Sequence, residues 1–189
     1  MKPKSGPIVI VFCGPESTAK STVSKQMASH YGAKWVPEHA RSYIEELARP
    51  YSYDDVVTIM QKQIVEYQRL LKSKHEIVIF DTFLIITKVW FEFVYQKVPD
   101  ELMNLLNKIH IDLYLLCEPD IPWVSDGVRE NEALRQELYD IYKKEIEKYQ
   151  FPYQTISGEG KSRLMDAQKY IDQILTKQTN YDHQPFTSR

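Results

Sequence analysis

A glycine, a lysine and a serine lie near the start of the chain with the spacing of a phosphate-binding loop. Gly14 ends the apolar run 7–13, and Lys20 and Ser21 follow six residues later, where a helical pattern begins. This strand–loop–helix order is typical of a P-loop, G-x-x-x-x-G-K-[ST]. In such a loop the backbone N–H groups surround a β-phosphate, the lysine reaches the β- and γ-phosphates, and the serine hydroxyl binds Mg²⁺. The alternative without a binding function is a glycine-containing turn before a helix that happens to contain a lysine. The expected nucleotide-binding residues are Gly14, Pro15, Glu16, Ser17, Thr18, Ala19, Lys20, Ser21 and Thr22.

One position departs from the P-loop pattern, because Ala19 stands where the second glycine is expected. If this site needs a positive φ, alanine costs about 1 kcal/mol or more there. If the site has a helical φ, alanine fits easily, and the sequence leaves both alternatives open.

The composition is that of one globular domain. With 189 residues, 43% of them hydrophobic, the chain can bury one α/β core and is too short for two large ones. The net charge of −2 favours neither nucleic acid nor an anionic membrane surface as a partner. No apolar run is as long as a membrane span, and the start of the chain lacks a signal-peptide core, so we expect a cytoplasmic protein. Cys13 and Cys117 are therefore expected to be reduced, buried thiols, with a disulfide as the minor alternative.

Strands and helices alternate along the chain. Apolar runs predict strands at 8–13, 34–37, 76–80, 112–117 and 153–156. Helical spacing predicts helices at about 22–31, 38–48, 52–74, 83–95, 99–107, 134–149 and 164–174. We expect one domain over 1–177, with a lid at about 118–136 and a flexible tail at 178–189. This order is typical of a parallel sheet whose strands end at one ligand-binding edge.

The third predicted strand ends in an acid, as a Walker B strand does. Asp81 can hold Mg²⁺ opposite Ser21, directly or through water. A helix N-cap is the alternative role, since aspartate is favoured there as well. Thr82 could either cap the helix or contact a phosphate.

Polar side chains also follow the second predicted strand. Glu38 could accept the proton of an acceptor hydroxyl or bind a ribose diol. Alternatively, it has no catalytic role and is an acidic residue in the first turn of a helix, where the helix dipole favours it. Arg41 could steady a phosphate or form an i, i+3 ion pair with Glu38. His39 is a candidate substrate contact, with an ordinary surface position equally open.

The predicted lid carries a further cation and an aromatic ring. Arg129 is expected to stabilise the γ-phosphate, with Asp126 orienting it or capping a helix. For Arg135 a solvated helix face is the favoured interpretation. Of the three tryptophans, Trp123 is the preferred stacking surface for a flat base, since tryptophans more often belong to the core.

Four ordered segments, GPESTAKST, VPEHARSYIEE, FDTFLIITKVW and LYLLCEPDIPWVSDGVRE, together resemble the NadR-type nicotinamide riboside kinase domain, a P-loop ATPase family. The resemblance covers about residues 7–160. It implies a five-stranded parallel sheet of order 2-3-1-4-5, ATP with Mg²⁺ as phosphoryl donor, and the 5′-hydroxyl of nicotinamide riboside as acceptor. By matching position, Glu38 and Arg41 fall on the family's substrate loop, Asp81 and Thr82 on its Asp-Thr motif, and Asp126, Gly127 and Arg129 on its lid motif.

Two further departures from the family bear on the substrate. Phe83 follows Asp81-Thr82, where members often carry an acid, which leaves the acceptor open. Only residues 1–6 precede the first strand, so the adenylyltransferase domain often fused ahead of this kinase is not expected, nor is synthesis beyond the mononucleotide.

The leading hypothesis is a small-molecule kinase in which Glu38 or Asp81 takes the proton and Lys20, Mg²⁺ and Arg129 stabilise the transferring phosphoryl group. A kinase for another nucleoside, or a nucleotide-dependent regulatory switch, are the alternatives. The guanine motif N/T-K-x-D is missing, since the run 107–110 fails at His110, and this favours adenine weakly. The oligomeric state is open, a homo-oligomer included.

Overall fold

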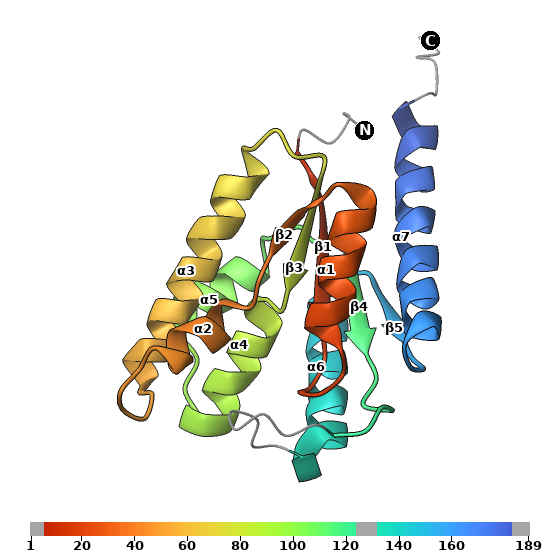
Figure 1. Ribbon diagram of the computed structural model, residues 1–189. Coiled ribbons are helices and arrows are strands. Elements are labelled where there is room, and N and C mark those ends of the chain that lie inside the picture. Colours follow the sequence, from red (N-terminus) through yellow and green to blue (C-terminus); the bar gives the residue numbers. More distant parts are fainter. Residues whose placement is uncertain (1–5, 124–131, 183–189) are drawn as a thin grey trace.

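The structure is a computed structural model that describes residues 6–123 and 132–182. Its centre is a five-stranded parallel sheet of order β2-β3-β1-β4-β5, which confirms the predicted P-loop fold (Figure 1). The strands are β1 (Ile8–Cys13), β2 (Lys34–Val36), β3 (Ile77–Asp81), β4 (Leu113–Cys117) and β5 (Tyr153–Ile156). β1 lies in the middle, paired with β3 on one side and β4 on the other.

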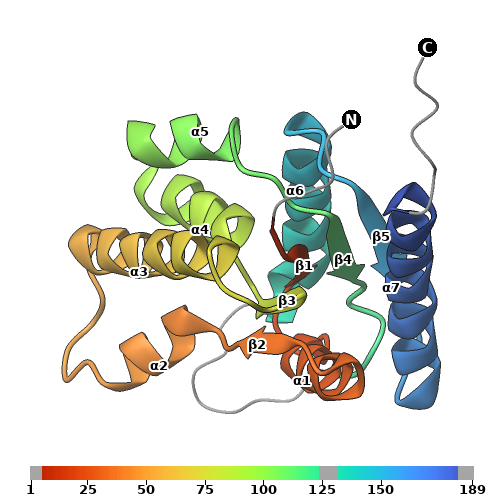
Figure 2. The same ribbon diagram turned by 90° about the horizontal axis from the view of Figure 1, so that it is seen from above.

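Helices cover both faces of the sheet. They are α1 (Lys20–Tyr31), α2 (His39–Glu45), α3 (Tyr53–Leu71), α4 (Leu84–Trp90), α5 (Asp100–Leu106), α6 (Arg135–Lys148) and α7 (Lys161–Asp182), with a π-helical turn η1 (Phe91–Tyr95) and a 3₁₀ turn η2 (Glu132–Leu134). Figure 2 shows α1 and α7 on one side of the sheet and α3, α4, α5 and α6 on the other. Each side has its own apolar core.

The strands are apolar throughout because both faces are covered. Along β1, Val9, Val11 and Cys13 point into the core of α3, α4 and α6, and Ile10 and Phe12 into the core of α1 and α7. Cys13 and Cys117 belong to opposite faces of the sheet, and both are free buried thiols, as predicted.

The start of α3 is fixed by a buried carboxylate. Asp55 accepts hydrogen bonds from the Ser52 backbone and hydroxyl, from Tyr43 and, through two nitrogens at 2.6 and 3.0 Å, from Arg49. The Ser52 hydroxyl in turn accepts a hydrogen bond from the Asp55 N–H, which completes a capping box. The predicted helix start at Ser52 is thus confirmed, and the cap also anchors the loop between α2 and α3.

Two helices differ from the prediction. The apolar helix expected at 83–95 is α4 followed by the π-turn η1, and Phe93 and Val94 of that turn are exposed rather than buried. The last helix, α7, runs on to Asp182, past the predicted start of a tail at 178. None of the helices in the described parts of the chain is long and apolar enough to span a membrane.

Candidate functional site

The strand register gathers four loops at one edge of the sheet. Phe12 of β1 lies opposite Asp81 of β3, and Cys13 lies opposite Leu116 of β4. The P-loop, the Asp81-Thr82 corner and the loop after Cys117 therefore leave the sheet side by side. Val36 lies opposite Phe80, which brings the loop containing Glu38 to the same level. The predicted convergence of these loops is confirmed for the described residues.

The P-loop itself alternates between ordinary and left-handed backbone. Ser17 has φ 51° and Ala19 has φ 59°, so the second-glycine position does need a positive φ, and alanine occupies it. Thr18 Oγ1 and Lys20 Nζ both donate to the carbonyl of Pro15, at 2.8 and 2.6 Å, across the loop. Lys20 and Ser21 stand at the N-terminus of α1, where the helix dipole favours an anion.

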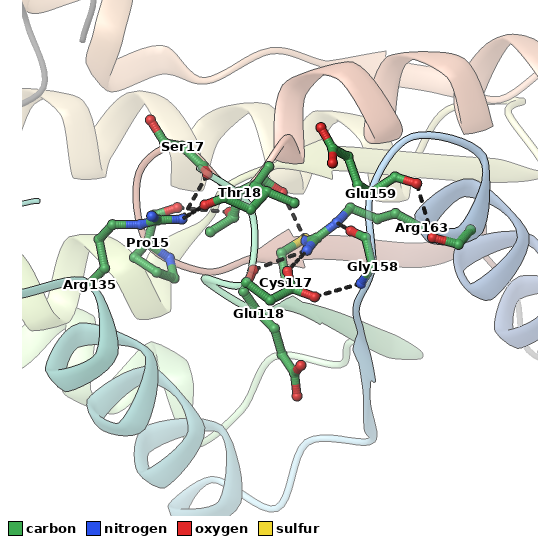
Figure 3. A network of polar contacts seen from close by, with 12 residues as sticks. Pro15, Ser17, Thr18, Cys117, Glu118, Arg135, Gly158, Glu159 and Arg163 are labelled. Atoms are coloured by element: carbon green, nitrogen blue, oxygen red, sulfur yellow. Dashed lines mark hydrogen bonds and ion pairs between the residues drawn. The ribbon is translucent and has the colours of Figure 1, made fainter. Parts of the chain in front are cut away.

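Two arginines from distant helices hold the outside of the P-loop (Figure 3). Arg135, at the start of α6, donates to the carbonyls of Ser17 and Ile121, each at 3.0 Å. Arg163, in the first turn of α7, donates to the carbonyl of Thr18 at 3.0 Å. The solvated position favoured for Arg135 is therefore wrong, because the guanidinium is directed to the loop.

Asp81 and Ser21 form the expected pair beside the loop. The Ser21 hydroxyl hydrogen-bonds the Asp81 carboxyl, and burial raises the pKa of that carboxyl while Lys20 and Arg41 lower it. Within the described residues, Asp81 Oδ1 is buried and has no hydrogen-bond partner. A buried carboxylate oxygen with spare capacity next to a serine hydroxyl fits a Mg²⁺ ion that is otherwise held by phosphates and water. No cluster of three or more His, Cys, Asp or Glu side chains that could hold a metal ion occurs in the part of the chain that the structure describes.

The helix after Asp81 does not use that residue as its cap. The N-cap of α4 is Phe83, which has no side-chain capping bond, so the N-cap alternative for Asp81 is wrong. Thr82 does not cap α4 either; it has φ 66°, a strained value for a β-branched residue, and its N–H donates to the carbonyl of Phe12 at 3.0 Å. Strain of this kind is often found at functional sites.

Glu38 faces the same charges as Asp81. Burial raises the pKa of the Glu38 carboxyl, Lys20 and Arg41 lower it, and Asp81 and Glu16 raise it. Glu38 is the N-cap residue of α2, yet its side chain makes no capping bond. Arg41 forms its i, i+4 ion pair with Glu45, at 3.0 Å. Two carboxylates, a lysine and an arginine thus share one electrostatic environment at the mouth of the P-loop.

His39, a predicted substrate contact, belongs to a different place. It lines a hollow of about 390 Å³ together with five residues of α3, namely Thr58, Gln61, Lys62, Val65 and Glu66. Burial lowers the pKa of His39, and the charges that act on it are Glu66 and Lys62. The structure therefore places His39 against α3, beside Glu66 and Lys62.

The predicted lid is described at its two ends. Trp123 lies 5.9 Å from the Arg135 guanidinium, ring centroid to carbon, which places an aromatic face beside the P-loop arginine. Asp126 and Arg129 lie outside the described residues. The other two tryptophans pack within the protein: the indole N–H of Trp35 donates to Ser24, and Trp90 contacts Tyr51 edge to face.

Two buried residues near the site had no signal in the sequence. Arg163 stands in an ordinary amphipathic helix and is only 1% exposed. Tyr142 of α6 is buried, and Glu16 and Glu38 are close enough to raise its pKa further. Only the packing of α6 and α7 against the sheet brings these side chains to the loop.

Comparisons with known proteins agree with this fold. A family model described as an AAA domain matches residues 9–163. The trifunctional NAD biosynthesis/regulator protein NadR of Escherichia coli is 21% identical over 178 residues, which is 89% of this chain and 43% of that protein. The chain therefore spans less than half the length of this curated relative.

Solved structures with the same fold include two of NadR. One, in complex with NR, has a TM-score of 0.75 and 22% identity, and covers 91% of this chain and 52% of its own. The other, in complex with NAD and AMP-PNP, has a TM-score of 0.68 and 20% identity, with coverages of 89% and 49%. A thymidylate kinase from Ehrlichia chaffeensis has a TM-score of 0.63 and 15% identity, with coverages of 88% and 99%. At these identities the likeness establishes a shared fold.

Proposed function

The chain belongs to the AAA-domain family, and from that premise we propose that it is an ATP-dependent kinase that phosphorylates the 5′-hydroxyl of nicotinamide riboside. The observation that carries the proposal is the meeting of Lys20, Glu38 and Asp81 at the mouth of the P-loop. A kinase needs a second carboxylate there to receive the acceptor proton. A hydrolysing switch can use the same group to activate water, so dependence of turnover on an acceptor separates the two functions.

The two carboxylates suit different tasks. Asp81 is bonded to the Ser21 hydroxyl and has a spare buried oxygen, so we assign the metal to these two residues. When bound, Mg²⁺ would neutralise the charge of the β- and γ-phosphates. Glu38 has no capping bond and a raised pKa, which makes its carboxylate a stronger base near neutral pH.

In the proposed reaction Glu38 takes the proton of the 5′-hydroxyl as that oxygen attacks the γ-phosphorus. The bond from the γ-phosphorus to the bridging oxygen breaks, and ADP leaves. Lys20 stabilises the charge on the transferring group, and the P-loop N–H groups hold the β-phosphate in place. Arg129 is proposed to act on the same group from the lid.

The choice of donor and acceptor is supported by the relatives. The solved NadR structures contain NR and AMP-PNP, ligands of the classes that this proposal requires. The chain also lacks a guanine motif at 107–110, which favours an adenine nucleotide.

A panel assay tests the proposal. ADP release is measured with ATP or GTP, without acceptor and with nicotinamide riboside, uridine, cytidine, thymidine or deoxyadenosine, and the product is identified by mass. We expect release to depend on nicotinamide riboside. A different best acceptor would identify the protein as a kinase for that nucleoside. Slow ADP or GDP release that no acceptor changes would indicate a nucleotide-dependent regulatory switch.

A matched pair of variants tests the base. E38Q should lower kcat by about 10²–10⁴-fold, the usual contribution of a positioned base. E46Q, which changes an exposed glutamate at the other end of α2, should leave kcat unchanged. Equal kcat values for the two variants would contradict the role of Glu38.

A further inference from the structure

Arg163 joins three loops that meet at the nucleotide-binding edge. Its Nε donates to the Gly158 carbonyl at 2.7 Å and its Nη2 to the Glu118 carbonyl at 3.2 Å, while Nη1 donates to Thr18 in the P-loop. Nη2 also pairs with Asp120, whose other oxygen accepts the Gly158 N–H at 2.6 Å. One buried guanidinium thus ties the P-loop to the end of β4 and to the turn between β5 and α7 (Figure 3).

The bond to Thr18 fixes the direction of a P-loop amide. The carbonyl of Thr18 and the N–H of Ala19 belong to one peptide unit, and no peptide bond in the described chain is cis. In a planar trans peptide these two groups point in opposite directions. Holding the carbonyl against Arg163 on the outside of the loop therefore turns the Ala19 N–H toward the inside, where a phosphate is bound.

The neighbouring peptide is held in the same way. Arg135 binds the Ser17 carbonyl at 3.0 Å, which turns the Thr18 N–H inward by the same argument. The loop needs such support, because Ser17 and Ala19 are both in the left-handed region without being glycine. External bonds to the intervening carbonyls hold a backbone that would otherwise relax.

We propose that Arg163 is a positioning residue for phosphate binding: it acts from the C-terminal helix, through the Thr18 carbonyl, on the amides that grip the nucleotide. It makes no contact with the nucleotide itself. The inference rests on the nucleotide-binding part of the proposed function and is independent of the acceptor.

The test measures binding of tripolyphosphate and of ATP, both with Mg²⁺, by titration calorimetry without any acceptor. R163M should weaken both ligands alike, by about tenfold or more, because the lost orientation affects phosphates and not the base. R163K, which keeps the charge and can reach one carbonyl, should lose less affinity for both ligands than R163M does. K161M, at an exposed position in the same turn of α7, and R69K, an exposed salt-bridged arginine on α3, are controls that should bind like the parent.

Circular dichroism and a thermal melt establish that each variant is folded at the temperature of the titration. A purely structural role would lower the melting temperature and leave the affinity of the folded protein unchanged. If R163M does not fold, R163K is used for the test instead, and the amide signals of Thr18 and Ala19 are followed by NMR. These signals should shift relative to the parent in R163K and keep their parent positions in K161M.

Several results would overturn the inference. One is a folded R163M protein that binds tripolyphosphate like the parent. If R163M does not fold, the equivalent result is an R163K protein that binds tripolyphosphate like the parent and whose Thr18 and Ala19 amide signals do not shift. Another is a loss for ATP alone, which would place the effect at the base. A parent protein that does not bind tripolyphosphate would refute the phosphate loop as well. Failure to phosphorylate nicotinamide riboside, with the expected tripolyphosphate results, would count against the proposed acceptor only.

Discussion

In the P-loop, replacement of Gly14 by alanine should be costly, whereas replacement of Ala19 by glycine should change the stability little. Gly14 has φ +140°, and a Cβ built on it would lie 2.6 Å from the carbonyl oxygen of Cys117 and 3.2 Å from its Cβ. Cys117 cannot move away easily, because it pairs with Ile156 of β5 on its other side. G14A therefore forces a strained backbone and a clash against fixed backbone at the same point.

The cost of G14A can be approximated from these two terms. A residue forced into a sparsely populated backbone region costs about 1–3 kcal/mol. Overpacking of a filled core costs about another 1–3 kcal/mol. G14A should therefore lower the free energy of unfolding by about 2–6 kcal/mol, a large share of the roughly 5–15 kcal/mol typical of a domain.

A19G is the matched comparison. Relief of the left-handed backbone at φ 59° gains about 1–2 kcal/mol, and the greater freedom of glycine in the unfolded chain costs about 0.5–1 kcal/mol. Loss of one half-buried methyl group costs up to about 0.8 kcal/mol more. A19G should therefore lie between about 1.5 kcal/mol more stable and about 0.8 kcal/mol less stable than the parent.

Urea unfolding of the parent and both variants, followed by circular dichroism, measures these free energies. Tripolyphosphate binding should be lost in G14A, because the loop must shift, and retained in A19G. A G14A variant that unfolds within about 1 kcal/mol of the parent, or that is more stable than A19G, would refute the assigned loop geometry.

Three further predictions concern buried or charged groups. Tyr114 Oη is buried with no hydrogen-bond partner among the described residues, so Y114F should raise the free energy of unfolding by about 1 kcal/mol; a loss of stability would reveal a hidden partner. Arg49 and the cap of α3 hold the pKa of Asp55 below its usual 3.8, so the carboxylate stabilises the fold fully above that pH and less as pH falls below it. The difference in unfolding free energy between the parent and D55N should therefore shrink below pH 3.8, and an equal difference at pH 3 and pH 7 would contradict this. Arg41 lowers the pKa of Glu38, so R41M should move the acid limb of the kcat/KM profile to higher pH; an unmoved or lowered limb would exclude the coupling.

The sequence predicted those features of the site that local patterns determine. The P-loop spacing and the acid at the end of an apolar strand identified Ser21 and Asp81, and the parallel sheet brought them together. The same patterns left the role of Asp81 open between metal and cap. That choice depends on where α4 begins, and the structure begins it at Leu84, after an uncapped Phe83.

What sequence reasoning missed depends on contacts between distant segments. Arg163 lies 145 residues from Thr18 in the chain, and its helix has no unusual spacing. An arginine in such a helix is most simply interpreted as solvated, and only the packing of α7 against the sheet shows otherwise. Arg135 was misjudged for the same reason. The length of α7 was underestimated because its last turns lack the apolar spacing that predicts a helix.

The direction of His39 illustrates a further limit. Its place next to Glu38 in the chain suggested a shared site, yet consecutive residues at a helix start point in different directions. Glu38 faces the P-loop charges, while His39 faces α3.

Lys20→Ala provides the most direct test of the whole account, with transfer of phosphate from ATP to nicotinamide riboside measured alongside the circular dichroism spectrum. The K20A variant should keep its fold and lose transfer, because the Lys20 ammonium lies 2.6 Å from the Pro15 carbonyl within the loop, where it would stabilise the transferring phosphoryl group. A folded K20A protein that phosphorylates nicotinamide riboside at the parent rate would contradict it.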